Sequence, residues 1–374
     1  MRQAHPFALR RAVALLLLLS LLPGAALAAR DKVPRTHQDV DHEGFTFISD
    51  RAGLEAIRQD PGGRYCLTAD IDLGDAPWEP MPFDGVFDGD GHTIYNVTIA
   101  QPDPVTAVTV DGNHKEYDTV FAAFFSRCTG AEIDNLTLKN VQIDIETDQN
   151  CFAAGLIGFG EDVKVNFVAV SGRIHLRSTN WMAGISGMLG FGHGQMEYPA
   201  ADVELVIVNM QEGVLCEQFL GGLTACGYPN IEYGNVKLSG FASVFGYAHH
   251  GGLVGMAHYH KGERYQQTKG YLRYNTIDAS IKFFEKTKSR RAYCKSEVGE
   301  NLHAVLSRFQ NKATRFKKTE IKKDKTVALL PETCPNPAYD SAVTPPTAEA
   351  WGCTTYTCAL CGYSYTDHYV PPTR

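Results

Sequence analysis

Gly155-Leu156-Ile157-Gly158 decides the interpretation of the whole chain, because close copies of it recur along the sequence. The other copies are Gly184-Ile185-Ser186-Gly187, Gly222-Leu223-Thr224-Ala225 and Gly252-Leu253-Val254-Gly255, with Ala123-Phe124-Phe125-Ser126 as a degenerate first copy. The first residues of successive copies are separated by 32, 29, 38 and 30 positions. A self-similar period near thirty residues predicts stacked repeats, because one such unit cannot bury its apolar face alone.

Segments rich in aliphatic and β-branched residues lie between these copies and favour strands over helices. Apolar and polar residues alternate in Leu136-Thr137-Leu138 and in Val141-Gln142-Ile143, as in a strand with one buried face. Glycine suits the corners between such strands, where a positive φ is expected. We therefore predict an all-β fold, a right-handed parallel β-helix (solenoid) over 63–282. About six coils at ~4.8 Å spacing would give a core on the order of 30 Å long.

The Gly-Leu-x-Gly copies resemble the GLUG repeat of bacterial surface proteins. The segments Tyr65 to Leu73, Trp78-Glu79-Pro80 and Phe83 to Ile94 are similar, in order, to the segment that leads into those β-helices. Together the resemblances cover residues 45 to about 281. They imply a secreted or cell-surface, adhesin-like protein of bacterial type, in a family also associated with surface peptidases. The family shares no single catalytic set, so the resemblance implies no catalytic residues.

Residues 1–28 have the pattern of a secretory signal peptide. Arg2, Arg10 and Arg11 precede an apolar stretch from Ala12 to Leu22, and Ala26-Leu27-Ala28 is a small-x-small cleavage site. No second hydrophobic span follows, so we expect an exported protein without a transmembrane segment in its mature chain.

The two ends of the repeat region are predicted to carry helical caps, because a stack of strands exposes apolar edges. The N-terminal cap lies within 29–62, where an alternating strand at 45–48 precedes a helix in which Leu54 and Ile57 share a face. At the other end, 283–330 is predicted to be a basic helical cap and linker. Its apolar residues fall at i, i+4, i+7, i+8 and i+11, which is a helical spacing. They are Val298, Leu302, Val305, Leu306 and Phe309, after Ser296 and Glu297 as a helix start.

Charge is distributed unevenly along a chain whose formal net charge is −7. Residues 261–325 contain 18 Lys and Arg against 7 Asp and Glu, which leaves an acidic remainder. The basic segment could hold anionic wall polymers or acidic glycans, or it could simply be a solvated face. Nucleic acid is not an expected partner for an exported protein with a net negative charge.

Residues 331–374 form a separate cysteine-rich module. The 37 residues from Cys334 to Val370 cannot build a sufficient core, so such a unit needs a metal or disulfides. Its cysteines could bind zinc tetrahedrally or form two disulfides. They are Cys334, Cys353, Cys358 and Cys361. The module resembles a short repeat near the C-termini of gut bacterial surface proteins, but Ala348 stands where that repeat has a cysteine and Cys353 where it has an aromatic residue.

The remaining cysteines and the histidines leave further alternatives open. Six cysteines are scattered along the repeat region, and disulfides and buried free thiols are both compatible with an exported solenoid. The densest histidine group is His249, His250, His258 and His260. His258 and His260 would point the same way from a strand and could form half of a transition-metal site, although scattered histidines explain the pattern equally simply.

Two functions from different classes fit these features. The first is a non-catalytic secreted surface protein that binds an extracellular glycan or a surface protein. The alternative is a carbohydrate-active β-helix enzyme, a polysaccharide lyase or glycoside hydrolase, which rests on fold analogy alone. Its candidate acids alternate along strands, as solvated residues also do. They are Glu132, Asp134, Asp162, Glu204 and Glu232. A peptidase role lacks a His-Glu-x-x-His sequence.

Overall fold

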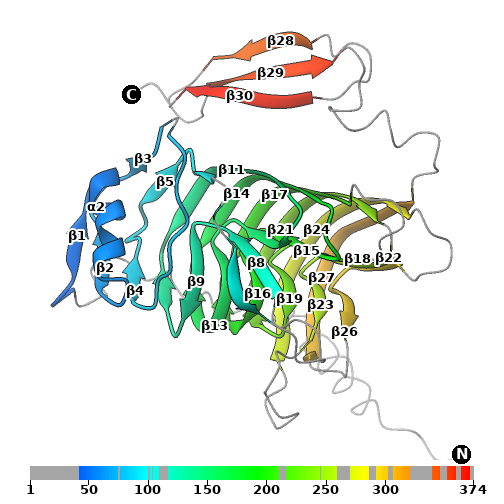
Figure 1. The fold of residues 1–374 in the computed structure, drawn as a ribbon, viewed down its shortest axis with the longest axis horizontal. Coiled ribbons are helices and arrows are strands. Elements are labelled where there is room, and N and C mark those ends of the chain that lie inside the picture. Colours follow the sequence, from blue (N-terminus) through cyan, green and yellow to red (C-terminus); the bar gives the residue numbers. More distant parts are fainter. Residues whose placement is uncertain are drawn as a thin grey trace, which may run out of the picture. The chain divides into compact units, whose positions relative to one another are not determined.

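Strands dominate the computed structural model of this chain, and most of them run parallel to their neighbours (Figure 1). The all-β prediction is therefore confirmed. The structure describes residues 42–74, 76–99, 102, 104–108, 117–209, 216–244, 246–258, 270–285, 292–301, 306–320, 339–345, 352–358 and 364–370. The predicted signal peptide, 1–28, lies outside these residues. None of the described helices is long and apolar enough to cross a membrane.

The chain enters the sheets through a short strand and a helix, as predicted for the N-terminal cap. The Asp50 carboxylate caps the helix by accepting a hydrogen bond of 2.8 Å from the Gly53 backbone N–H. Leu54 and Ile57 are both fully buried in the main apolar cluster. The first elements are β1 (Thr46–Ile48), α2 (Arg51–Ala56), η2 (Ile57–Gln59), β2 (Arg64–Leu67), β3 (Ile71–Asp72), β4 (Val86–Asp88), β5 (Thr93–Tyr95) and β6 (Thr98–Ile99).

From here to Glu320 the chain alternates between a smaller sheet and a large one. The smaller sheet contains β7 (Val105–Val108), β8 (Tyr117–Ala122), β12 (Asn150–Ala154), β15 (Met182–Ser186), β18 (Cys216–Gly221), β22 (Gly246–Gly251) and β25 (Ala292–Lys295). The large sheet adds β9 (Phe125–Thr129), β10 (Glu132–Asp134), β11 (Thr137–Thr147), β13 (Ile157–Asn166), β14 (Ala169–Ser178), β16 (Leu189–Glu197), β17 (Ala200–Asn209), β19 (Thr224–Gly227), β20 (Asn230–Glu232), β21 (Asn235–Val244), β23 (Val254–Ala257), β24 (Gly270–Glu285), β26 (Val298–Asn301) and β27 (Leu306–Glu320).

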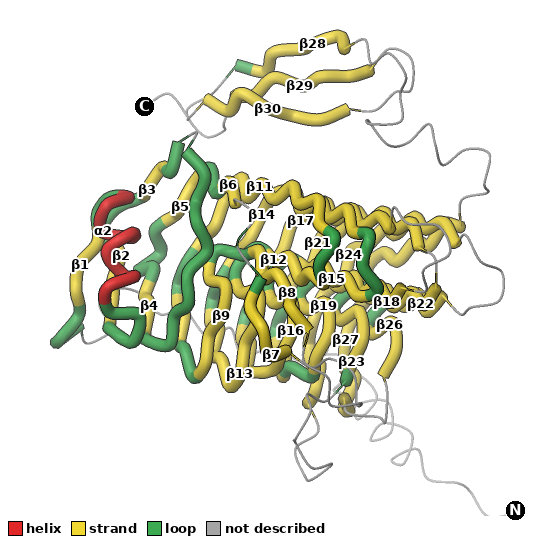
Figure 2. Tube along the Cα trace, viewed as in Figure 1, coloured by secondary structure: helices red, strands yellow, loops and turns green. Residues whose placement is uncertain are grey.

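Each repeat contributes one strand to the smaller sheet, turns a sharp corner, and continues through the large sheet in two segments (Figure 2). The next repeat follows the same course, so that equivalent residues pair in parallel. Cys151 pairs with Ala183, for example, and Ile174 pairs with Leu205. We call the residues at one position of successive repeats a column. Neighbours in a column point the same way and lie about 4.8 Å apart.

The hydrogen bonds between repeats show that one copy of the glycine motif begins three residues later than predicted, at Gly187 and not at Gly184. Gly155 N donates to Gly187 O at 3.2 Å, and Gly187 N donates to Gly222 O at 3.1 Å. The stacked copy is therefore Gly187-Met188-Leu189-Gly190, and the predicted copy at Gly184 was wrong. Gly184 and Gly187 can each begin a Gly-x-x-Gly sequence, and contact with the neighbouring repeats decides between them. Leu156, Met188, Leu223 and Leu253 form the resulting fully buried column.

Close approach, and not a positive φ, explains the first glycine of each motif. A Cβ on Gly155 would lie 2.5 Å from Gly187 O, one on Gly222 would lie 2.2 Å from Gly252 O, and one on Gly252 would lie 2.1 Å from Ser296 O. None of these glycines is among the described residues with a positive φ. The predicted conformational reason was therefore wrong, and the lack of a side chain is what the corner requires.

The predicted basic helix after residue 282 was also wrong, because the described part of 283–330 forms strands. β25, β26 and β27 make one more repeat, with Ser296-Glu297-Val298-Gly299 at its corner. Val254 pairs with Val298, and β27 runs along β24 from Gly270 to Phe283. The helical spacing of apolar residues was coincidental, because pairing with β23 and β24 satisfies this backbone and a helix would leave those edges open.

Two apolar clusters lie against the smaller sheet. Alternate residues of a strand face opposite sides, so Cys151 and Ala153 contribute to the main cluster while Phe152 belongs to a second one. The second cluster is mostly aromatic and is also buried. Its members are Phe121, Phe152, Phe159, Met182, Phe191, Phe219, Ala225, Cys226 and Met256.

The predicted C-terminal module contains a separate antiparallel sheet. Its strands are β28 (Tyr339–Thr344), β29 (Gly352–Cys358) and β30 (Ser364–Val370). Tyr339 pairs with Cys358 and Thr344 pairs with Cys353, without a register shift between them.

The corner geometry predicts the effect of a single methyl group. Gly222→Ala would place a Cβ 2.2 Å from the carbonyl oxygen of Gly252 and 2.6 Å from the side chain of Val236. We expect it to lower the free energy of unfolding in urea by about 2 kcal/mol or more. Gly62→Ala is the matched control, because nothing lies within 4 Å of a Cβ there and its φ is not positive. Equal stability of the two variants would contradict the close-approach explanation.

Candidate functional site

An aromatic ladder lies at the corner where the two large-sheet segments of each repeat meet. The corner residues have a positive φ of 51° at Asn135, 53° at Phe167, 54° at Tyr198, 56° at Tyr233 and 59° at Tyr274. A left-handed backbone costs a residue with a side chain roughly 1–2 kcal/mol. This cost therefore needs a compensating interaction at every corner.

Hydrogen bonds between repeats supply part of that compensation. Phe167 N donates to Glu197 O at 2.9 Å, and the next corners repeat this bond. Tyr198 N donates to Glu232 O at 2.9 Å, and Tyr233 N donates to Arg273 O at 3.1 Å. The sharp turn thus directs each corner N–H to the carbonyl just before the next corner, so the turns reinforce one another along the stack.

Ring stacking supplies the rest. The ring centroids of Phe167 and Tyr198 are 4.6 Å apart, those of Tyr198 and Tyr233 are 4.8 Å apart, and those of Tyr233 and Tyr274 are 5.2 Å apart. The planes of these pairs differ by 9°, 11° and 21°. Each such pair contributes about 0.5–1.5 kcal/mol beyond its buried area. Because the rings cover one another, the inner ones present mainly their edges to solvent.

Tyr274 ends the ladder and is different. Tyr274 is 45% exposed. Tyr233 stacks on one side of its ring, and no described ring stacks on the other side. Beside it, Arg273 pairs with Glu232, and the Arg273 guanidinium lies 4.1 Å from the centre of the Tyr271 ring. An exposed aromatic ring next to polar groups suits an amphipathic ligand such as a sugar, which has an apolar C–H face and a rim of hydroxyls.

The five candidate acids are distributed over four strands, and each faces a partner in a neighbouring repeat. Glu132 lies 3.7 Å from Lys164, Asp162 lies 3.3 Å from His193, and Glu204 lies 3.6 Å from His175. Asp134 accepts a hydrogen bond of 2.6 Å from Asn166, and Glu232 pairs with Arg273. No two of these acids are paired with each other in the described contacts.

The electrostatics of Glu204 also oppose a role as a general acid. The neighbouring His175 side chain, 3.6 Å away, is the main reason that the pKa of Glu204 lies below its ordinary value. A glycosidase general acid requires the opposite shift, because it must hold a proton near neutral pH. The lowered pKa of Glu204 therefore does not suit it to that role.

The histidine group does not converge on one point. His249 and His250 are neighbours on β22 and face opposite sides of its sheet: His249 Nδ1 lies 2.9 Å from Glu300 Oε2, whereas His250 is fully buried near Phe283. His258 follows β23, and its N–H donates to Gly227 O at 3.3 Å. His260 lies outside the described residues. No three metal-binding side chains are grouped in the described part of the chain.

Six cysteines of the repeat region are buried free thiols, which decides between the alternatives left open by the sequence. Burial raises the pKa of the thiol to about 12 at Cys66 and to about 11 at Cys294. The six are Cys66, Cys128, Cys151, Cys216, Cys226 and Cys294. They act as small apolar fillers and not as nucleophiles.

The structure describes the backbone at two of the four predicted ligands of the C-terminal module. Cys353 and Cys358 both lie on β29, five positions apart. The choice between zinc and disulfides in this module stays a prediction. Cys334 and Cys361 lie outside the described residues.

The aromatic ladder was missed by sequence reasoning. A signal was present, because Phe167, Tyr198, Tyr233 and Tyr274 follow one another at 31, 35 and 41 positions, close to the repeat period. Tyrosine and phenylalanine are ordinary strand residues, however, so the pattern did not identify a corner.

Burial of His250 predicts a dependence of stability on pH. Desolvation lowers the pKa of His250 from 6.5 to about 3 in the folded protein. The unfolded chain therefore binds a proton that the folded chain does not, and stability falls as the pH drops below 6.5. We expect a loss on the order of 3 kcal/mol from this residue between pH 7.5 and pH 4.5.

His250→Leu tests this, because Leu220 occupies the same column one repeat earlier. Urea unfolding at the two pH values should show a smaller acid-induced loss in the variant. His92→Gln is the control, since His92 is a surface residue beside Asp70. An unchanged acid-induced loss in His250→Leu would show that another group causes it.

Burial also predicts slow thiol chemistry. Cys128, Cys151 and Cys226 are 0% exposed, and burial raises the pKa of each thiol. We expect iodoacetamide at pH 7.5 to leave all three unmodified in the folded protein and to modify them in urea, as read by peptide mass spectrometry. Rapid modification of any of them without urea would mean that the main or the second cluster opens.

Comparisons with known proteins leave the sequence resemblance as a prediction. No protein-family model matches the chain. No curated protein matches it either.

Proposed function

We propose that the stacked repeats form a right-handed parallel β-helix that is exported and binds extracellular glycans without catalysing a reaction. The alternation of each repeat between two parallel sheets and the shared apolar interior support the β-helix. The signal-peptide pattern of residues 1–28 supports export. A bacterial surface location follows from the resemblance to GLUG-repeat proteins.

The exposed ring of Tyr274 is the observation that carries the binding proposal. The ladder below it holds the ring in a fixed orientation, so little side-chain entropy is lost when a ligand packs on it. The C–H face of a sugar ring would cover the tyrosine, and its hydroxyls would bond to the carboxylate and guanidinium of the Glu232–Arg273 pair. A sugar also suits a site that is shallow and partly solvated, where an apolar ligand would gain less.

The alternative, a polysaccharide lyase or glycoside hydrolase, has less support. Catalysis of glycosidic cleavage by two carboxylates requires them to flank one bond, about 5 Å or about 6.5–9.5 Å apart. The candidate acids instead lie on β10, β13, β17 and β20 and face cations or amides of neighbouring repeats. Binding needs no such pair.

Tyr274→Ala is the direct test of the binding proposal. On an array of bacterial and host glycans, the unmodified protein should bind a defined subset, and the variant should lose at least tenfold in affinity for the same glycans. Phe47→Ala is the matched control, because Phe47 is a 57% exposed aromatic residue at the N-terminal end. It should bind like the unmodified protein.

Two results would contradict the proposal. One is that the Tyr274→Ala variant binds glycans as tightly as the unmodified protein and has the same melting temperature as the Phe47→Ala control. The other is turnover of a polysaccharide that disappears when one of the five candidate acids is replaced, which would establish the enzymatic alternative.

A further inference from the structure

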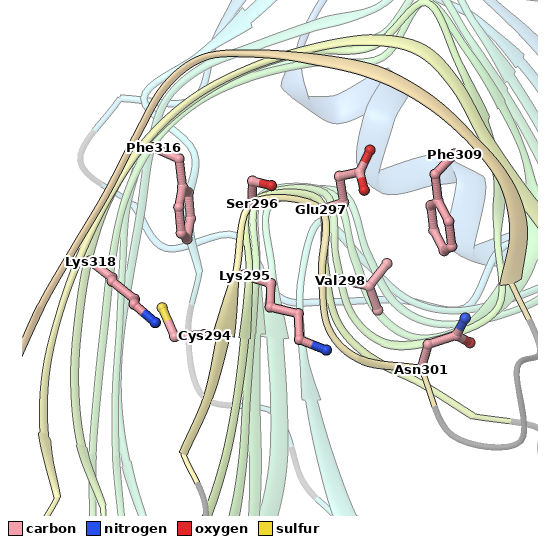
Figure 3. A pocket seen from close by; sticks show the side chains of 9 residues that line it. All are labelled: Cys294, Lys295, Ser296, Glu297, Val298, Asn301, Phe309, Phe316 and Lys318. Atoms are coloured by element: carbon pink, nitrogen blue, oxygen red, sulfur yellow. The ribbon is translucent and has the colours of Figure 1, made fainter.

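The last described repeat borders a cavity that is open to solvent and that the proposed glycan site does not use. The cavity has a volume of about 580 Å³ and lies between β27 on one side and the corner of β25 and β26 on the other (Figure 3). Its walls include Cys294, Val298, Phe309, Phe316 and Lys318. The size is within the range of small-molecule sites in proteins, roughly 300–1,000 Å³.

One wall residue has a charge where its column is otherwise apolar. Lys318 pairs with Ile281, and Ile281 continues a column that contains Gly240, Leu205 and Ile174. Pairing in register makes Lys318 point the same way as these residues, toward the interior. Figure 3 shows its side chain extending into the cavity toward Cys294.

Two exposed lysines, Lys295 and Lys318, and one acid, Glu297, line this cavity, so its described wall has a net positive charge. No described carboxylate forms an ion pair with Lys318, and the carboxylate of Glu297, the acid in the wall, accepts a hydrogen bond of 2.8 Å from Asn311. Burial raises the pKa of the Cys294 thiol to about 11, so this group is neutral at pH 7 and does not balance the lysine.

The rest of the wall suits an apolar group. Phe309 is an aromatic residue that is 41% exposed. Val298 belongs to the main apolar cluster, and Phe316 packs against that cluster. In Figure 3 the two phenylalanine rings stand on opposite sides of the Ser296–Glu297 corner, so they would contact different parts of one bound molecule. Covering them would remove apolar surface from water, at about 25 cal/mol per Å².

We propose that this cavity binds an apolar carboxylate, with its acid group at Lys318 and its hydrocarbon part against Phe309, Phe316 and Val298. The lysine supplies selectivity for the anion, and the aromatic walls supply most of the contact area. The proposal is independent of glycan binding at Tyr274, because the two sites share no residue.

Calorimetric titration of the full chain with decanoate, decanol and decyltrimethylammonium tests the proposal. Decanoate should bind saturably and at least tenfold more tightly than decanol, and decyltrimethylammonium should not bind. Lys318→Ile introduces the residue that Ile281 provides one repeat earlier, and it should lose at least tenfold in decanoate affinity while decanol binding is kept. Lys317→Ser is the matched control, because it introduces the residue of Ser280 at an exposed position of the same strand and should bind decanoate normally.

A second measurement uses the cavity's own thiol. Decanoate should slow the alkylation of Cys294 by N-ethylmaleimide, as read by peptide mass spectrometry, because it would occupy the space through which the reagent reaches the sulfur. The slowing should be absent in Lys318→Ile at the same decanoate concentration. The absence of decanoate binding, equal binding of decanoate and decanol, or unchanged affinity in Lys318→Ile would each overturn the proposal.

Discussion

Hydrogen bonding in register between successive repeats is the constraint on which the other features depend. Because each strand pairs in parallel with its equivalent in the next repeat, every side chain lies over the side chain at the same position one repeat away. Side chains therefore cannot be understood one strand at a time. The glycine at each corner follows from this constraint, since a Cβ on Gly222 would strike the carbonyl of Gly252. The left-handed corner residues and their stacked rings follow from it as well, because a ring can stack only where the neighbouring repeat presents another ring at the same place.

The same constraint governs the charges on the outside. Two like charges in one column would lie about 4.8 Å apart, which is unfavourable unless a partner balances them. One column alternates in sign. Lys237 lies 2.8 Å from Asp202, and its pKa is raised mainly by that hydrogen bond; the column continues through Asp278, which pairs with Arg315 at 2.6 Å. Another column places Glu197 beside Glu232, and Arg273 follows Glu232 and forms an ion pair with it.

The sequence predicted the class of fold. The β-rich composition is visible in each segment, and the repeat period is visible when the copies are compared. It did not predict which glycine forms the second corner, since Gly184 and Gly187 are equivalent until a neighbouring repeat is placed beside them. The helix expected around Val298 failed for the same reason: its spacing fits a helix, and the open edges of β23 and β24 make it a strand. Of the candidate site, Glu232 was named for its charge, but its partner Arg273 and the exposed ring of Tyr274 become neighbours through pairing across 41 residues or more.

The last described repeat differs from the earlier ones in several columns. Glu297 follows Leu253 in the corner column, Glu300 follows Met256 in the aromatic cluster, and two inward positions of β27 change from Ile281 and Phe283 to Lys318 and Glu320. Charges at inward positions of an edge strand prevent another strand from adding, because they would be buried without solvent. They also leave the interior of this repeat incompletely filled, with a cation among aromatic walls. The cavity proposed to bind an apolar carboxylate therefore lies where columns of the last described repeat change from apolar to charged residues, and the same change supplies the lysine to which the acid group would bind.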